Sequence, residues 1–256
     1  MTVATEFRDQ VAVIKLNRPQ ALNALNEQML ADLRTAVDDA EACGCRAMVF
    51  TGAGDKALCA GADIAQLQAR APATHRANLG QAQALFNRIQ QSALPSVAVI
   101  HGFAFGGGLE LALACTFRIA TAEARMALPE VKLGLIPGYG GTQRLPRLIG
   151  EARAAELILS GRAVDAEEAL LIGLINRIMD GGDPADLGRA FLEPMIRHSK
   201  VATAMAREAM RRGLDGTLAP GLAIEADMFA LCVRSHDASE GMAAFLAKRP
   251  ARFTDS

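Results

Sequence analysis

Short β-rich apolar runs alternate with segments of helical periodicity in the first part of the chain, and this alternation constrains the fold more than any other feature. Three runs have the length and composition of buried strands: Val11–Leu16, Ala47–Phe50 and Val97–Ile100. Asn26 is a predicted N-cap for a helix between the first two runs, and a second helix through Phe86 leads to the third. The alternation predicts an α/β fold, with helices packed over sheets and loops gathered at strand ends.

The strand signal fades from about Glu151, apart from Leu174–Ile178, and the sequence becomes Ala-rich. Segments with helix-compatible patterns, separated by Gly or Pro, are Glu151–Leu159, Asp165–Leu171, Pro184–Arg197, Val201–Arg212 and Leu218–Val233. We find no sustained heptad and no fixed-period repeat of the solenoid kind. The last third of the chain is therefore predicted to be helical.

Composition excludes several classes of protein. The chain has 256 residues, of which 51% are hydrophobic and 21% charged, enough to bury a sizeable core. Its 27 basic and 28 acidic residues give a formal charge of −1, so no net field favours nucleic acid or an anionic membrane. Aromatic residues make up only 4%, with no Trp and one Tyr, which leaves little material for base stacking. We expect neither nucleic acid nor membrane as a partner.

The cysteines and histidines predict neither disulfides nor a metal site. Five cysteines are odd in number and sparse, and the pair Cys43 and Cys45 lacks zinc-ligand spacing. The four histidines have no second ligand at metal spacing, and His101 is expected to be a structural residue at a strand end. The N-terminus does not have the order of a signal peptide, and no segment has the apolar length of a membrane span. We expect a cytoplasmic protein with reduced cysteines and no metal.

Two glutamates in one apolar, glycine-rich stretch are the main indication of chemistry. Glu110 closes the segment His-Gly-Phe-Ala-Phe-Gly-Gly-Gly-Leu-Glu, and Glu130 follows in Ala-Leu-Pro-Glu-Val-Lys-Leu-Gly-Leu-Ile-Pro-Gly. A carboxylate among leucines is expensive to bury as an ion, so it should have a raised pKa, be paired, or be catalytic. A second carboxylate in the next segment suggests a shared role.

Two small-residue turns could supply hydrogen-bond donors beside these acids. Gly106–Gly108 opens a predicted helix, whose first turn directs free N–H groups and a partial positive charge outward. Ala60–Ile64 is a similar turn, with Asp63 placed to cap the next helix. Each turn alone is more often a packing device than a site. Together with the carboxylates, they are the parts needed for proton transfer beside a carbonyl group.

These motifs resemble the crotonase, or enoyl-CoA hydratase/isomerase, superfamily, and the resemblance runs in order through nearly the whole chain. The segments that carry it are Leu16–Pro19, Ala21–Leu25, Cys59–Ile64, Gly106–Ala112, Pro129–Glu130, Gly134–Gly138, Gly140–Leu145 and Glu240–Phe245. The resemblance implies a spiral of repeated ββα units. Residues 1–195 would form this core and carry the active site, and residues 196–256 a helical trimerisation region.

The resemblance also implies the site and its ligand, an acyl-CoA thioester. The backbone N–H groups of Ala62 and Gly107 correspond to the oxyanion hole, and Glu110 and Glu130 to the catalytic carboxylates. The further substrate and CoA contacts that it suggests are Ala60, Gly61, Asp63, Ile64, Gly106, Phe245 and Lys248. No separate cofactor is expected, because coenzyme A is part of the substrate. The assembly implied is a homotrimer or a homohexamer made of two trimers.

Retention of both glutamates favours an enoyl-CoA hydratase, a lyase that adds water to a trans-2-enoyl-CoA to give a 3-hydroxyacyl-CoA, a step used in fatty-acid metabolism among other pathways. Two alternatives stay open: a double-bond isomerase of the same superfamily, and a non-catalytic RNA- or protein-binding member. A dinucleotide fold is disfavoured because Gln143 stands where its fingerprint requires a third glycine. Thr142 is instead expected to be the N-cap of a helix through Leu145.

Overall fold

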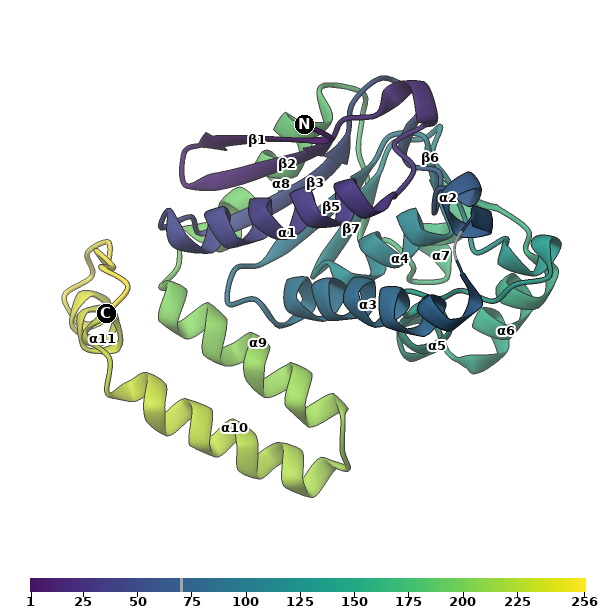
Figure 1. Ribbon diagram of the computed structural model, residues 1–256. Helices are drawn as coiled ribbons and strands as arrows, with labels where there is room; N and C mark the ends of the chain where they lie inside the picture. The colour runs from purple at the N-terminus through teal and green to yellow at the C-terminus, as the bar shows by residue number, and fades with distance from the viewer. Residues whose placement is uncertain (70) are drawn as a thin grey trace. The chain divides into compact units, whose positions relative to one another are not determined.

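Successive strands are divided between two sheets (Figure 1). The computed structural model describes residues 1–69 and 71–256. The six-stranded sheet has the order β1 (Val3–Arg8), β2 (Val11–Leu16), β3 (Ala47–Gly52), β5 (Ser96–Ile100), β7 (Phe117–Ala120) and β10 (Arg177–Ile178). The four-stranded sheet has the order β4 (Ala57–Cys59), β6 (Phe103–Phe105), β8 (Arg125–Ala127) and β9 (Val164–Asp165). All pairings are parallel except β1 with β2 and β8 with β9.

Each turn of the chain adds one strand to each sheet and then a helix. The pair β3 and β4 is followed by α2 (Ile64–Ala69), η2 (Pro72–Thr74) and α3 (His75–Gln91). The pair β5 and β6 is followed by α4 (Gly107–Ala114), and the pair β7 and β8 by η3 (Glu130–Leu133) and α5 (Gly141–Ile149). The expected spiral of ββα units is confirmed. The remaining elements of this part are η1 (Pro19–Ala21), α1 (Glu27–Ala42), α6 (Glu151–Ser160) and α7 (Ala166–Leu171).

The central strands of the larger sheet are buried on both faces, which explains why they read as unbroken apolar runs. Even-numbered side chains such as Phe50 and Ile100 join the main hydrophobic cluster. Odd-numbered ones face α8 (Pro184–Ile196), where a Cβ on Gly188 would lie 2.5 Å from Val49 Cγ1 and 3.0 Å from Val99 Cγ2. Glycine at 188 therefore lets this helix lie directly on the strands.

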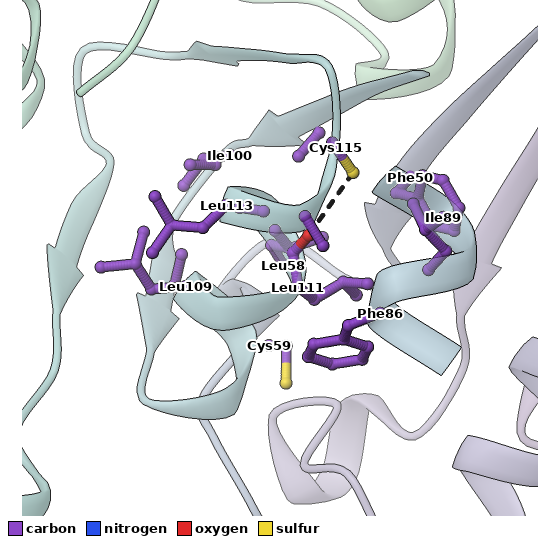
Figure 2. Packing of buried hydrophobic residues seen from close by; sticks show 14 of the residues in the cluster. Phe50, Leu58, Cys59, Phe86, Ile89, Ile100, Leu109, Leu111, Leu113 and Cys115 are labelled. Carbon is purple, nitrogen blue, oxygen red and sulfur yellow. Dashed lines mark hydrogen bonds between the residues drawn. The ribbon is translucent and has the colours of Figure 1, made fainter. Parts of the chain in front are cut away.

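Helix α4 is buried on all sides. It contacts β5 and β7 of the larger sheet, β4 and β6 of the smaller one, and the helices α3 and α5. Figure 2 shows Leu111 extending toward Phe86, while Leu109 and Leu113 point to the other side of the helix, and all three belong to the main hydrophobic cluster. A helix enclosed in this way must be apolar all round. Glu110, 1% exposed, is its one charged residue.

The chain divides into two units, Met1–Phe191 and Leu192–Ser256, each described by itself. The division falls within α8, and the predicted boundary after residue 195 lies near the end of the same helix. The second unit contains α9 (Lys200–Leu214), α10 (Leu218–Val233) and α11 (His236–Leu246). The buried carboxylate of Asp237 accepts hydrogen bonds from the Thr254 and Asp255 amides and so holds the last residues of the chain to the start of α11.

Some local predictions were right and others wrong. Asn26 caps α1 by accepting a 2.8 Å hydrogen bond from the Met29 amide, as expected. Thr142 is not an N-cap, because α5 begins at Gly141 behind Gly140, whose φ of +114° suits glycine. The strand expected over Leu174–Ile178 is reduced to Arg177–Ile178, and α6 and α7 of the helical third belong to the first unit. In the part of the chain that the structure describes, no helix has the length and hydropathy to cross a bilayer.

Candidate active site

A cavity of about 660 Å³ in the first unit gathers most of the residues expected at the site. Its wall combines the loop after β4, the first turns of α4, the segment from Pro129 to Gln143, and parts of α2 and α3. The expected residues that line it are Ala60, Gly61, Ala62, Ile64, Gly106, Gly107, Glu110 and Glu130. Asp63 is absent from the wall, and Phe245 and Lys248 belong to the second unit.

The two expected oxyanion donors are available for a ligand. Gly107 is the first residue of α4, where the N–H groups have no intrahelical acceptor. Ala62 forms an isolated bridge with Leu25, whose hydrogen bonds are made by the Gly61 carbonyl and the Asp63 amide on either side. Among the described residues, neither the Ala62 N–H nor the Gly107 N–H donates to a protein acceptor. Both amides therefore have a free hydrogen at the cavity wall.

Two of the three glycines before Leu109 are required by close contacts. Gly106 has φ +49°, and a Cβ there would lie 2.8 Å from Oε1 of Glu130. A Cβ on Gly108 would lie 2.1 Å from the Cys59 carbonyl oxygen, which no side chain can tolerate. These contacts seat the N-terminus of α4 against the end of β4. The triple glycine thus brings the Gly107 amide close to the loop that carries Ala62.

The segment before α1 holds the loop after β4 in place. Backbone hydrogen bonds join Ala60 to Leu22 and Leu25 to Gly61, at 2.9 and 2.8 Å. Asp63 was expected both to cap the next helix and to contact the substrate, and the cap is observed. Its carboxylate accepts from Arg18 at 3.2 Å and caps α2 through a 3.3 Å bond from the Gln66 amide. Asp63 thus joins the loop after β4 to Arg18 and to the first turn of α2.

The two carboxylate oxygens of Glu110 have different surroundings. Oε1 accepts hydrogen bonds from the amides of Tyr139 and Gly141, both at 2.7 Å. Oε2 has no protein partner in the described part of the chain. Burial raises the pKa of this carboxyl to about 7; the charge of Glu130 adds to the rise, and the two amides and the charge of Arg144 oppose it. The side chain can therefore lose or gain a proton near neutral pH.

Glu130 stands at the start of η3, half-buried in the cavity wall. Its Oε2 is shielded from solvent and has no hydrogen-bond partner among the described residues. Burial raises the pKa of this carboxyl as well. A buried carboxylate oxygen without a donor is costly, which indicates that a ligand or water satisfies it in the working protein.

The comparisons with known proteins establish the family. Residues 6–256 match the enoyl-CoA hydratase/isomerase family. The chain belongs to this family. It is 38% identical over 254 residues to the crotonyl-CoA hydratase of Syntrophomonas wolfei, covering 98% of this chain and 97% of that protein. It is 36% identical over 248 residues to the short-chain-enoyl-CoA hydratase of Clostridium acetobutylicum, covering 96% and 95%.

The fold of this family member also matches solved relatives. The crystal structure of the enoyl-CoA hydratase from Bacillus anthracis superposes with a TM-score of 0.95 at 34% identity, over 100% of both chains. At this level of identity and coverage, the crotonase fold is established for the whole chain. The division of the strands between two sheets and the helical C-terminal region are features of that fold.

Several residues of this family member's site were not assigned a role from sequence. The turn from Tyr139 to Gly141 supplies both amides that bind Glu110, and of its residues only Gly140 and Gly141 were part of the resemblance. Helix α3 contributes His75, Leu79 and Gln83, which lie four residues apart on one face. The apolar part of the wall consists of Leu67, Leu79, Leu133, Leu135, Ile136 and Pro137.

His101 and the possible metal ligands are separate from the two glutamates. His101 Nε2 donates to the Gly54 carbonyl at 3.0 Å, and its Nδ1 lies 3.4 Å from the Thr51 hydroxyl, as expected for a structural histidine at a strand end. Within residues 1–69 and 71–256, no cluster of three or more His, Cys, Asp or Glu side chains is arranged to hold a metal ion.

Proposed function

We propose that this enoyl-CoA hydratase adds water to a trans-2-enoyl-CoA with Glu110 and Glu130 holding one water between them. The observation that carries the assignment is the meeting, in one cavity, of two carboxyls with raised pKa values and two backbone N–H groups without acceptors. The relatives named as a crotonyl-CoA hydratase and a short-chain-enoyl-CoA hydratase support a short acyl chain as substrate.

The thioester carbonyl oxygen would accept hydrogen bonds from Ala62 and Gly107. Addition of oxygen at the β-carbon moves negative charge onto this carbonyl oxygen, which becomes an enolate. The N-terminus of α4 adds a partial positive charge behind the Gly107 amide. Donors of this kind act mainly on the developing charge, and the loss of one costs about 2.7–4 kcal/mol of transition-state stabilisation.

The two acids would divide the protons of one water. Glu110, with Oε1 held by two amides, would use Oε2 to orient the water and accept its proton as the new C–O bond forms. Glu130 would enter protonated and deliver its proton to the α-carbon as the enolate collapses. The pair then holds one proton before and after the step, so atoms and charges balance. Because the two carboxyls interact, they titrate as a pair rather than as two independent acids.

Hydration of crotonyl-CoA tests this proposal. Glu110→Gln and Glu130→Gln should each lower kcat by at least about a hundredfold, the usual contribution of acid–base catalysis, while circular dichroism stays that of the wild type. Glu123→Gln is the matched control, because Glu123 is exposed and lies outside the cavity. Wild-type rates in both active-site variants would show that the assignment is wrong.

A double-bond isomerase is the second candidate, since the same carboxylates could move a proton between carbons. It is separated by offering a 3-enoyl-CoA and following conjugation of the double bond. Faster turnover of that substrate than of the 2-enoyl-CoA would reverse the assignment. Salt-sensitive RNA binding together with no thioester turnover would instead support a binding protein.

We also propose a homotrimer, alone or paired into a hexamer, with the second unit at the subunit contacts. Helices α9 and α10 expose large apolar side chains, including Leu214 at 85%, Leu218 at 77% and Phe229 at 71%. Such a surface is more extensive than a soluble monomer usually leaves in water. Light scattering after gel filtration should give three or six times the chain mass. A mass equal to that of one chain would contradict the proposal.

Phe245, which is 83% exposed, and Lys248 stay proposed contacts for the adenosine end of CoA. Lys248→Ala should raise KM for crotonyl-CoA and leave KM for a truncated pantetheine thioester unchanged. Equal changes for both substrates would remove Lys248 from the CoA site. A cytoplasmic location also stays a prediction, for which cell fractionation is the test.

A further inference from the structure

Arg144 occupies an unusual place beside the site. It is half-buried on α5 and forms no ion pair with any acid among the described residues. Its donors go to neutral groups instead. Nε donates to Gln90 Oε1 at 2.8 Å, Nη2 to Asn87 Oδ1 at 2.6 Å, and Nη1 to the Tyr139 carbonyl at 2.9 Å. Its positive charge is therefore not neutralised by a paired carboxylate from the described part of the chain, although the side chain is half-buried.

A polar stripe on α3 holds this arrangement from the other side. Gln83, Asn87 and Gln90 follow at helical spacing, so they share one face of the helix. Gln83 Nε2 donates to the Gly138 carbonyl at 2.8 Å, while Asn87 and Gln90 accept from Arg144. Helix α3 thus supports the segment 138–144 directly and through the arginine.

The turn between Tyr139 and Gly141 is held from both sides. Arg144 donates a hydrogen bond to the carbonyl of Tyr139, and Glu110 Oε1 accepts hydrogen bonds from the amides of Tyr139 and Gly141. Gly140 has φ +114°, and a Cβ there would lie 2.1 Å from Arg144 Nη1. Only glycine at position 140 therefore leaves room for the Arg144 guanidinium against this turn.

We propose that Arg144 is a positioning residue for hydration. By holding the Tyr139 carbonyl, its guanidinium keeps both amides on Oε1 of Glu110, which leaves Oε2 for the water. Its charge also favours the ionised form of Glu110 that accepts the water's proton. Arg144 does not line the cavity, so it acts through Glu110 and not on the substrate. The inference rests on the hydratase mechanism proposed above.

The charge of Arg144 lowers the pKa of Glu110. The charged groups that act on Glu110 are Glu130 on η3 and Arg144 on α5. His75 on α3 lines the same cavity, and Cys59 on β4 lies against Gly108 in the first turn of α4. Burial raises the pKa of Cys59 to about 12, so this thiol is neutral in the working range. Arg144 is the cation whose charge lowers the pKa of Glu110 against burial and Glu130. Without it, Glu110 stays protonated to higher pH.

The test compares Arg144→Gln and Arg144→Lys with the wild type in the full-length protein. The control is Arg153→Gln, because Arg153 is exposed on α6 and outside the cavity. For Arg144→Gln, the acid limb of kcat against pH should move up by about one unit. Near neutral pH this shift alone should lower kcat about fivefold, and the lost fork should lower it further, so kcat should recover only in part at higher pH, with KM for crotonyl-CoA unchanged. Arg144→Lys keeps the charge and loses the fork, so its limb should stay near that of the wild type while kcat is lower at every pH.

A direct titration separates this inference from the proposed function. The carboxyl ¹³C signal of Glu110, assigned by its loss in Glu110→Gln, reports its protonation without any substrate. In Arg144→Gln this titration should also move to higher pH, and in Arg153→Gln it should not. A wild type that fails to hydrate, with the titration shift present, would refute the hydratase but not the coupling of Arg144 to Glu110.

Two outcomes would overturn the role of Arg144. One is a rate reduced by the same factor at every pH in Arg144→Gln together with an unmoved Glu110 titration, as expected for a purely structural residue. The other is a wild-type profile in both Arg144 variants. If Arg144→Gln does not fold, Asn87→Ala loosens the guanidinium by removing one acceptor. A wild-type kcat and pH profile in Asn87→Ala, with Arg144→Lys also at the wild-type rate, would equally refute the inference.

Discussion

Replacing Glu110 by glutamine should make the protein more stable at alkaline pH while it abolishes hydration. The raised pKa means that the folded state keeps a proton that the unfolded chain releases. For such an acid, stability is highest below the ordinary pKa of 4.5 and falls as pH rises towards about 7. Glutamine is neutral at every pH, and its Oε1 can still accept from the amides of Tyr139 and Gly141. The variant therefore avoids the cost of ionising a buried carboxyl.

The magnitude follows from the difference between a pKa of about 7 and the ordinary 4.5. At about 1.4 kcal/mol for each pKa unit, ionisation costs the folded state about 3 kcal/mol once the pH exceeds 7. Glu110 is 1% exposed, so solvent screening does not reduce this figure. The gain of Glu110→Gln should rise from near zero at about pH 4.5 to about 3 kcal/mol at about pH 8. In a Glu130→Gln background the gain should be smaller, because one like charge is already removed.

Urea unfolding between about pH 5 and pH 8, at one fixed protein concentration, measures this difference. Glu123→Gln is the control, because this exposed carboxylate is solvated in both states. A stability difference that does not change with pH would refute the reasoning. A less stable glutamine variant at about pH 8 would do so too, since it would show that the buried charge is fully compensated.

Three other predictions concern the framework of the site. Gly108→Ala should lower the free energy of unfolding by at least about 2 kcal/mol, because its Cβ would lie 2.1 Å from the Cys59 carbonyl oxygen. Gly80→Ala is the control in the same urea assay. It should raise the free energy of unfolding by about 0.5 kcal/mol, because Gly80 has open space around it on α3. Arg118→Met should cost about 3 kcal/mol, because buried carbonyls of Leu174 and Cys115 lose their donor; an unchanged denaturation midpoint would contradict this. Iodoacetamide at about pH 8 should modify the exposed Cys43 and spare Cys59, whose pKa burial raises to about 12; peptide mapping that finds Cys59 alkylated in folded protein would disprove it.

The fold was predictable where an element is long and buried. The strands around Val13, Phe50 and Val99 were found because both faces of the larger sheet are covered, which gives unbroken apolar runs. The strands of the smaller sheet were missed. Of these, β4, β6 and β8 have three residues each, too few for any periodicity to show. Their pairing depends on contacts between residues far apart in sequence.

The site was predictable where a residue type is expensive in its surroundings. A glutamate among leucines, after three glycines, has few uses other than chemistry, so Glu110 was evident in the sequence. Asp63 shows the opposite case. Its cap of α2 was predicted, but its ion pair with Arg18 was not, because the partner of a charged side chain near the surface depends on which residue the fold brings close.

The sequence by itself determines the order of the elements, the burial of α4 and the presence of two carboxyls near a pair of glycine-rich turns. These are properties of local composition and spacing. Only the tertiary structure decides that the Tyr139 and Gly141 amides take Oε1 of Glu110, that Oε2 of Glu130 has no donor, and that Arg144 faces the same turn. The reason is physical: a pKa depends on burial and on charges a few ångströms away, and the chain brings those groups together only when it folds.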